Sequence, residues 1–173
     1  YCYAEVRPLV ATGRAVGKPE DNNIFAVTPV ASVVDVEVDE ETGEYQVLQI
    51  ITAHDIGKTI NLESARGQIL GGAVMQMGLT VMEEFKMENG RVVTPSFTEY
   101  LIPTSMDAPL RNKAVLIEGN LGNACPEGAK GIGEHSLYTL GGALVNAIHD
   151  AIGVTILQLP ITPERVLKAL SRI

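Results

Sequence analysis

The feature that most constrains the fold is an alternating segment with a glycine in its middle. Residues 33–39 read VVDVEVD, residues 45–51 read YQVLQII, and a short polar stretch containing Gly43 separates them. Apolar residues at every second position are typical of a strand with one buried face, and glycine readily adopts the positive φ that a tight turn needs. The sequence therefore predicts an antiparallel β-hairpin.

A glycine-dense helix is predicted after this hairpin. Residues 63–81 read ESARGQILGGAVMQMGLTV and follow Asn61, a residue type that commonly caps helix N-termini. Each glycine inside a helix costs about 0.5–1 kcal/mol relative to alanine. The segment contains four of them, Gly67, Gly71, Gly72 and Gly78. We therefore expect another backbone or a ligand to approach this helix closely.

The rest of the chain mixes strands and helices. A second hairpin is predicted at Asn89-Gly90, and a short strand over residues 113–119. Two C-terminal helices should follow. The first spans about residues 137–152, with Leu140, Leu144 and Ile148 on one face and Gly153 at its end; the second begins at Thr162-Pro163.

This order of elements predicts an α+β domain, because no regular βαβ alternation is present. In it, β-hairpins pack with the Gly-rich helix and the two C-terminal helices. We expect residues 1–24 to form an extended arm or a remnant of upstream chain, and residues 25–173 to form the domain.

Composition excludes several classes of function. The net charge of −8 and the absence of a Lys/Arg cluster argue against binding to nucleic acid or an anionic membrane. No apolar run is long enough to span a bilayer. Cys2 and Cys125 lie far apart and the three histidines lack metal-ligand spacing, so no metal site is predicted from these residues. A reduced cytoplasmic protein is the simplest expectation.

The stretch GAKGIGEHSL, residues 128–137, contains the most informative carboxylate, Glu134. One interpretation is an ordinary acid at a helix start, stabilised by the helix dipole. The other is a general base, because Gly131 and Gly133 leave the backbone open to a ligand and its N–H groups available to an anionic oxygen. In that case Lys130 is a candidate to hold an anionic cofactor or to tune the carboxylate.

Two glutamines on the Gly-rich helix are candidate ligand contacts. Gln68 and Gln76 lie eight residues apart, about 80° around the helix axis, so they can line one groove. Two pairs of sequence neighbours, His54-Asp55 and Glu134-His135, contain groups that can transfer protons. Only their adjacency in the sequence suggests this role. Neighbours in a sequence rarely face each other, so loop hydrogen bonding is the simpler expectation there.

Taken in order, these motifs resemble the carboxy-terminal end of the molybdenum-binding subunit of the xanthine dehydrogenase/aldehyde oxidase family. The blocks that carry the resemblance are VVDVEVDEETGEYQVLQIITAHDIGKTIN, GQILGGAVMQMG, PSFTEYLIPTSMD and EGAKGIGE, and the tail NAIHDAIGVTILQLPITPERVLKAL is similar as well. Together they cover nearly everything from about residue 27 to residue 170. Several blocks in order are far more specific than a lone glycine motif.

The resemblance implies an activity and a set of cofactors. Family members hydroxylate an electron-poor carbon of an N-heterocycle or an aldehyde with oxygen from water. A molybdenum ion on a pterin dithiolene (molybdopterin) accepts two electrons, which leave through iron–sulfur clusters and, in many members, FAD. The expected partners are the upstream part of the molybdenum subunit, iron–sulfur and FAD subunits or domains, and a small-molecule substrate.

The resemblance also implies residue roles. The glutamate that ends the GAKGIGE motif is the family's general base and maps to Glu134. The glutamine of the GQ pair contacts the cofactor and maps to Gln68. The other expected cofactor contacts are Gln76, Lys130 and the open backbone at Gly131 and Gly133.

The sequence departs from the family pattern at two places. Family members commonly have two prolines after the glutamate, where this chain has His135-Ser136, and INP is common where this chain has INL at residues 60–62. The first departure favours an alternative, a non-catalytic docking or assembly module that kept the fold. A second alternative is the reductive aromatic-thioester chemistry of one branch of the family.

Overall fold

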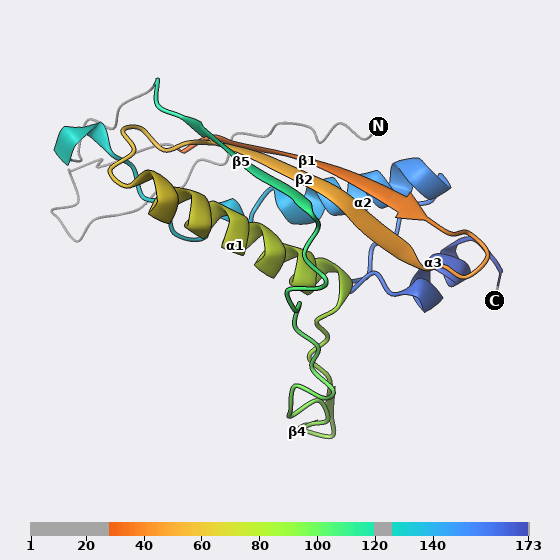
Figure 1. The fold of residues 1–173 in the computed structure, drawn as a ribbon. Helices are drawn as coiled ribbons and strands as arrows, with labels where there is room; N and C mark the ends of the chain where they lie inside the picture. The colour runs from red at the N-terminus through yellow and green to blue at the C-terminus, as the bar shows by residue number, and fades with distance from the viewer. Residues whose placement is uncertain (1–27, 120–125, 173) are drawn as a thin grey trace, which may run out of the picture.

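The computed structural model describes residues 28–119 and 126–172 of the 173-residue chain, so the expected arm over residues 1–24 lies outside the described residues. Figure 1 shows a short sheet with helices beneath it. The strands are β1 (Val30–Val38), β2 (Tyr45–Asp55), β3 (Met87–Glu88), β4 (Arg91–Val92) and β5 (Arg111–Ile117). The helices are α1 (Leu62–Val81), α2 (Leu140–Ile152) and α3 (Pro163–Ala169), with single 3₁₀ turns η1 (Pro126–Gly128) and η2 (Glu134–Ser136). No helix in the described part of the chain is long and apolar enough to cross a membrane.

Strands β1 and β2 form the predicted antiparallel hairpin, which the structure confirms. Their pairing runs from Val30 opposite His54 to Val38 opposite Tyr45. Gly43 in the turn has a φ of +74°, and a Cβ there would lie 2.3 Å from the carbonyl oxygen of Pro163. Both the backbone conformation and the space therefore require glycine.

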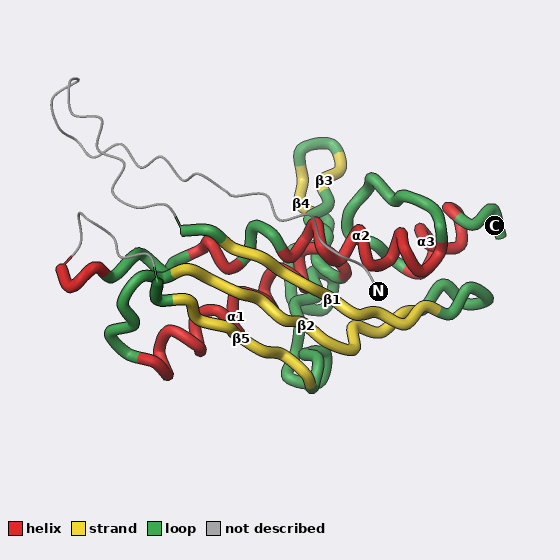
Figure 2. The backbone as a smooth tube through the Cα atoms, turned by 90° about the horizontal axis from the view of Figure 1, so that it is seen from above, coloured by secondary structure: helices red, strands yellow, loops and turns green. Residues whose placement is uncertain are grey.

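Strand β5 completes a three-stranded sheet in the order β1-β2-β5 and runs parallel to β2. The chain from β2 through α1 to β5 is thus a β–α–β connection, which the sequence pattern did not predict. The helices cover one face of the sheet (Figure 2). On the other face Val33 and Ile117 are 42% and 46% exposed.

The core lies between the sheet and the two longer helices. The predicted apolar face of α2 is confirmed, because Leu140, Leu144 and Ile148 are all buried. The first cluster joins the sheet to α1 and α2 through Val34, Ile50, Ala73, Met77, Leu140, Ala143, Leu144 and Ala147. The second joins the end of α2 to α3 through Ile148, Ile152, Ile156, Ile161 and Val166.

The helix α1 begins at its predicted cap, since Asn61 Oδ1 accepts a hydrogen bond from Ser64 N at 2.9 Å. Two of its glycines are sites of close approach. A Cβ at Gly72 would lie 1.9 Å from Ser136 Oγ, and one at Gly78 would lie 2.4 Å from the ring of Pro103. The other two, Gly67 and Gly71, have open space in the described structure.

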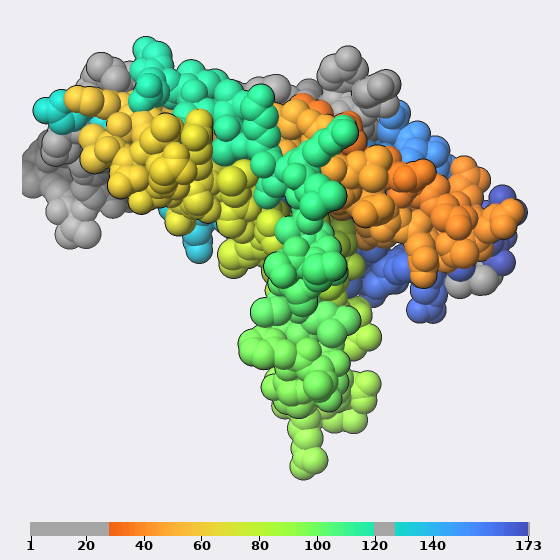
Figure 3. All heavy atoms as spheres, viewed as in Figure 1, coloured from red at the N-terminus to blue at the C-terminus, as the bar shows by residue number. Residues whose placement is uncertain are grey.

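Residues 82–110, which we call the finger, project from the body (Figures 1 and 3). The finger contains the predicted hairpin β3–β4, and positive φ angles at Asn89 and Gly90 confirm its turn. Glu84 fixes its root, with ion pairs to Arg165 (2.7 Å) and Lys86 (2.9 Å).

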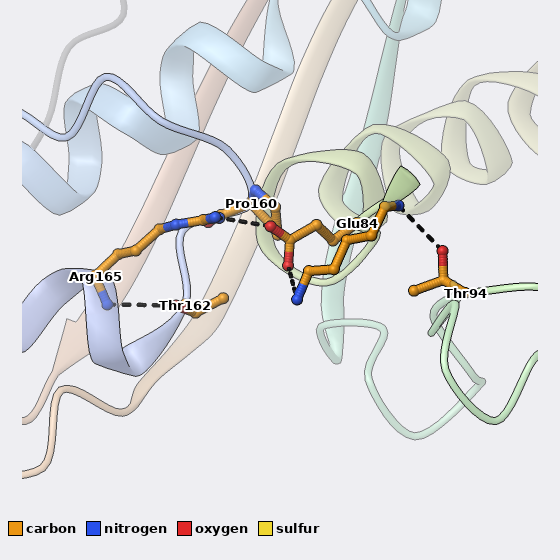
Figure 4. Close-up of polar contacts among 6 residues, drawn as sticks. Glu84, Thr94, Pro160, Thr162 and Arg165 are labelled. Carbon is orange, nitrogen blue, oxygen red and sulfur yellow. Dashed lines mark hydrogen bonds and ion pairs between the residues drawn. The ribbon is translucent and has the colours of Figure 1, made fainter. Parts of the chain in front are cut away.

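The helix α3 supplies the other half of this root (Figure 4). Its predicted cap is confirmed, because Thr162 Oγ1 accepts a hydrogen bond from Arg165 N at 3.3 Å and Pro163 is the first helical residue. The guanidinium of Arg165 also donates to the carbonyl oxygen of Pro160. The finger is therefore tied to α3 through Arg165.

Candidate functional site

The Gly-rich turn, residues 128–134, is attached to the chain that follows β2. Gly57 and Ala129 form a β-bridge, Lys130 N donates to Ile56 O at 2.9 Å, and Lys58 N donates to Gly128 O at 3.2 Å. Gly57 has a φ of +63°, and a Cβ there would lie 2.1 Å from Gly128 O. Only glycine fits at position 57, so the loop HDIG, residues 54–57, sets the position of the Gly-rich turn.

Lys130, in the Gly-rich turn, forms a buried ion pair with Asp55 at the end of β2. Its Nζ lies 2.9 Å from Asp55 Oδ1, and the two side chains are 2% and 9% exposed. The backbone N–H of Gly57 donates to the same carboxylate oxygen at 3.2 Å. The residue predicted to hold an anionic cofactor therefore has a protein carboxylate as its partner.

Glu134 is exposed and lies in the 3₁₀ turn η2, not in α2. The helix α2 begins six residues later at Leu140, with Thr139 as its N-cap, and its first turn contains no acidic residue. The expected helix start near residue 137 is thus three residues too early. The interpretation of Glu134 as an acid stabilised by the α2 dipole fails, because that dipole acts within the first helical turn.

Gln68 lies beside this turn. Its Nε2 donates to the carbonyl oxygen of Gly133 at 3.4 Å, and its side chain is exposed. Gly131 and Gly133 are exposed as well, and no atom of the described residues lies within 4 Å of a Cβ built on either. The Gln68 amide therefore lies beside exposed glycine backbone, next in the chain to the exposed Glu134, and a bulky polar ligand can lie against this backbone.

Gln76 lies elsewhere on α1. It is half-buried, its Nε2 donates to Thr80 Oγ1 at 3.2 Å, and a Cβ at Gly141 would lie 2.6 Å from the same nitrogen. Gln76 thus occupies the contact between α1 and α2. The structure does not bring it together with Gln68 in one groove as the helical spacing suggested.

A histidine pair, with His54 buried and His135 half-buried, lies next to the Gly-rich turn, and the sequence did not predict it. The rings of His54 and His135 pack edge to face, with centroids 5.0 Å apart and an interplanar angle of 65°. Burial, and secondly the neighbouring His135, lower the pKa of His54 to about 4; burial also lowers the pKa of His135. Among the described residues neither ring nitrogen of His54 has a hydrogen-bond partner. The alternation of β2 could have placed His54 on the helix-covered face, but nothing in the sequence indicated its neighbour.

An apolar groove lies at the other end of the molecule. It encloses about 880 Å³ and is lined by the start of β2, the end of α1 and residues 105–111, including Tyr45, Met77, Val81 and Met106. None of the predicted site residues lines it. In the described part of the chain, no three His, Cys, Asp or Glu side chains gather closely enough to hold a metal ion.

Comparison with known proteins shows which family the chain belongs to. Residues 1–109 match the model of the molybdopterin cofactor-binding domain. Over 142 residues the chain is 39% identical to a protein of Bacillus subtilis named as a probable xanthine dehydrogenase subunit, covering 82% of this chain and 19% of that protein. The chain thus spans less than a fifth of the length of this relative.

Solved structures share the fold. Quinoline 2-oxidoreductase from Pseudomonas putida 86 superposes with a TM-score of 0.75 at 33% identity, over 83% of this chain and 18% of that one. The aldehyde oxidoreductase of Desulfovibrio gigas gives 0.75 at 30% identity, over 83% and 15%. The family model, the sequence identity and the shared fold agree. The chain belongs to the molybdopterin cofactor-binding domain family of xanthine dehydrogenase- and aldehyde oxidoreductase-type proteins.

Proposed function

We propose that this chain is part of a molybdenum hydroxylase that acts on an electron-poor carbon of an N-heterocycle or an aldehyde, with Glu134 as the general base. The observation that carries the proposal is the exposure of Glu134 at the end of the Gly-rich turn, directly after Gly133, whose carbonyl oxygen accepts a hydrogen bond from Gln68. A general base needs a carboxylate that a substrate can reach, held by the fold in one place.

Hydroxylation of this kind converts R–H and water into R–OH, two protons and two electrons. When bound, the molybdenum cofactor supplies the oxygen atom, taken from water, and accepts the two electrons. Glu134 takes up one proton as the new C–O bond forms. Because its side chain is exposed, Glu134 can afterwards release this proton to solvent.

The residues around Glu134 fit such a cofactor. Gln68 offers an amide that can donate to or accept from a polar group, and the backbone at Gly131 and Gly133 can be approached without a Cβ in the way. Gln76 and Lys130 were expected to contact the cofactor too. Since both have protein partners, we propose that they support the site through packing and an ion pair.

The proposed partners follow from the length of the relatives. The matched part of the Bacillus subtilis protein is 19% of that chain, which is itself named as one subunit. We propose that the remaining parts of a molybdenum subunit, together with iron–sulfur and FAD domains or subunits, complete the enzyme and carry the electrons away. A cytoplasmic location remains a prediction from the sequence.

The test is a Glu134→Gln variant of the complete enzyme, with turnover measured per bound molybdenum. Loss of the base should lower kcat at least about 100-fold while molybdenum content is retained. Glu127→Gln is the matched control, because Glu127 is an exposed carboxylate of the same segment, paired with Lys58 at 2.6 Å. An unchanged rate in Glu134→Gln would favour the non-catalytic docking module.

A further inference from the structure

We propose that His54 and Asp55, adjacent at the end of β2, are positioning residues that hold the two ends of the segment carrying Glu134. The inference rests on the proposed role of Glu134. Successive side chains of a strand point to opposite faces of a sheet, so two neighbours can serve two different anchors. Each of these neighbours contacts one side of the exposed stretch 131–134.

The first anchor is the ion pair of Asp55 with Lys130. Its Nζ–Oδ1 distance is 2.9 Å, and the side chains are almost completely buried. The bridge between Gly57 and Ala129 and the bond from Lys130 N to Ile56 O place the backbone alongside. A charge left unpaired in such a position is strongly unfavourable, so the pair fixes where the exposed stretch begins.

The second anchor consists of two contacts. His54 packs against His135, and Ser136 packs against α1. The two imidazoles pack edge to face. Ser136 is 1% exposed and lies against α1 where Gly72 provides room. The chain directly after Glu134 is therefore held against both β2 and α1.

Between the anchors no residue of the stretch 131–134 is buried, and two of its four residues are glycines. Glycine has the most backbone freedom to lose, so a short glycine-rich stretch is ordered chiefly by what fixes its ends. Releasing one end should let Glu134 sample many positions. A general base that must meet its proton within hydrogen-bond distance then works more slowly.

The experiment compares Lys130→Met with Lys58→Met in the complete molybdenum enzyme. Both remove an ammonium from the same junction, but the Lys58–Glu127 pair is exposed, at 51% and 66% for the two side chains. For Lys130→Met we expect the amides of residues 130 and 137, which donate to Ile56 O and Glu134 O at the two ends of the stretch 131–134, to exchange at least tenfold faster. We also expect kcat per molybdenum to fall at least tenfold, with KM changed less than twofold. Lys58→Met should change each quantity less than twofold.

The double variant Asp55→Leu/Lys130→Met removes both buried charges together, which avoids an unpaired charge if the single variant fails to fold. It should show the same faster exchange and lower kcat. Exchange rates and kcat equal to those of Lys58→Met would overturn the inference, as would faster exchange with an unchanged kcat. Glu134→Gln is measured in parallel: if it keeps full turnover, the proposed function fails, while the exchange data still report on the anchor itself.

Discussion

Two side-chain pairs, one at each end of the exposed stretch 131–134, hold it by different interactions. Asp55 and Lys130 are a charged pair, and each side chain neutralises the other. His54 and His135 carry no mutual hydrogen bond and pack as rings, so they are stable there only while uncharged. The lowered pKa of His54, about 4, expresses this cost of charging a buried imidazole.

The histidine pair predicts a loss of stability in mild acid. An unfolded His54 binds its proton near pH 6.5 and the folded one near pH 4, so the unfolded state holds more protons in this window. The free energy of unfolding should therefore fall as the pH drops from 6.5 to 4, by on the order of 2 kcal/mol from His54. Denaturant unfolding of the chain across this range measures it.

His54→Phe should remove that part of the pH dependence, because a phenyl ring keeps the packing and cannot titrate. His149→Gln is the control, since His149 lies on the exposed end of α2 with Thr155 as its partner. If His54→Phe loses as much stability in acid as the unchanged protein does, the histidine pair is not the cause.

At the scale of elements, local signals in the sequence predicted most boundaries. The alternation before and after Gly43 predicted β1 and β2, and the caps at Asn61 and Thr162 predicted two helix starts. Alternation does not reveal strand direction, so the parallel pairing of β2 with β5 stayed hidden.

The candidate site was predictable only in part. The Gly-rich motif and the family resemblance predicted Glu134 as the base and Gln68 as a cofactor contact; in the structure Gln68 donates to Gly133, the residue before Glu134. No local signal could show that Lys130 would reach Asp55, because the two are 75 residues apart and meet through tertiary contacts. The start of α2 at Leu140 was not predictable either, because it depends on a tertiary contact: Ser136 packs against Gly72 of α1.

Two glycines of α1 give opposite predictions for the same substitution. A Cβ at Gly72 would lie 1.9 Å from Oγ and 2.8 Å from Cβ of Ser136, so rotation of the hydroxyl alone does not relieve the clash. Gly72→Ala should lower the free energy of unfolding by about 1–3 kcal/mol. Gly67 has open space, so Gly67→Ala should raise it by about 0.5–1 kcal/mol. Denaturant unfolding of the two variants checks both signs, and equal effects would contradict the close packing of α1 against η2.

At the scale of the whole molecule, much apolar surface is left uncovered. The finger in Figure 3 stands away from the body, and Val33 and Ile117 are 42% and 46% exposed on the face of the sheet that the helices do not cover. Large apolar side chains exposed on the finger include Phe85, Met87, Phe97, Leu101, Ile102 and Met106, which is 90% exposed. Several large apolar side chains exposed on one segment are typical of an interaction site. It supports the proposal that this chain works against further parts of a molybdenum subunit.

The chain alone should therefore bind little molybdenum. Among the described residues we propose four contacts to the cofactor, Gln68, Gly131, Gly133 and Glu134, and a ligand of that size needs contacts on more than one side. Metal analysis of the purified 173-residue chain should find less than about a tenth of an equivalent of molybdenum and no turnover of an N-heterocycle. Near-stoichiometric molybdenum with turnover would contradict this expectation.

The central claim, that Glu134 moves the proton in the chemical step, is tested most directly by a single-turnover measurement. The complete enzyme, unchanged or with Glu134→Gln, is mixed rapidly with substrate in the absence of an electron acceptor, and the rate of reduction of its bound centres is followed by absorbance. At equal molybdenum content, the account predicts that Glu134→Gln is reduced at least about 100-fold more slowly. Reduction at the rate of the unchanged enzyme would contradict it.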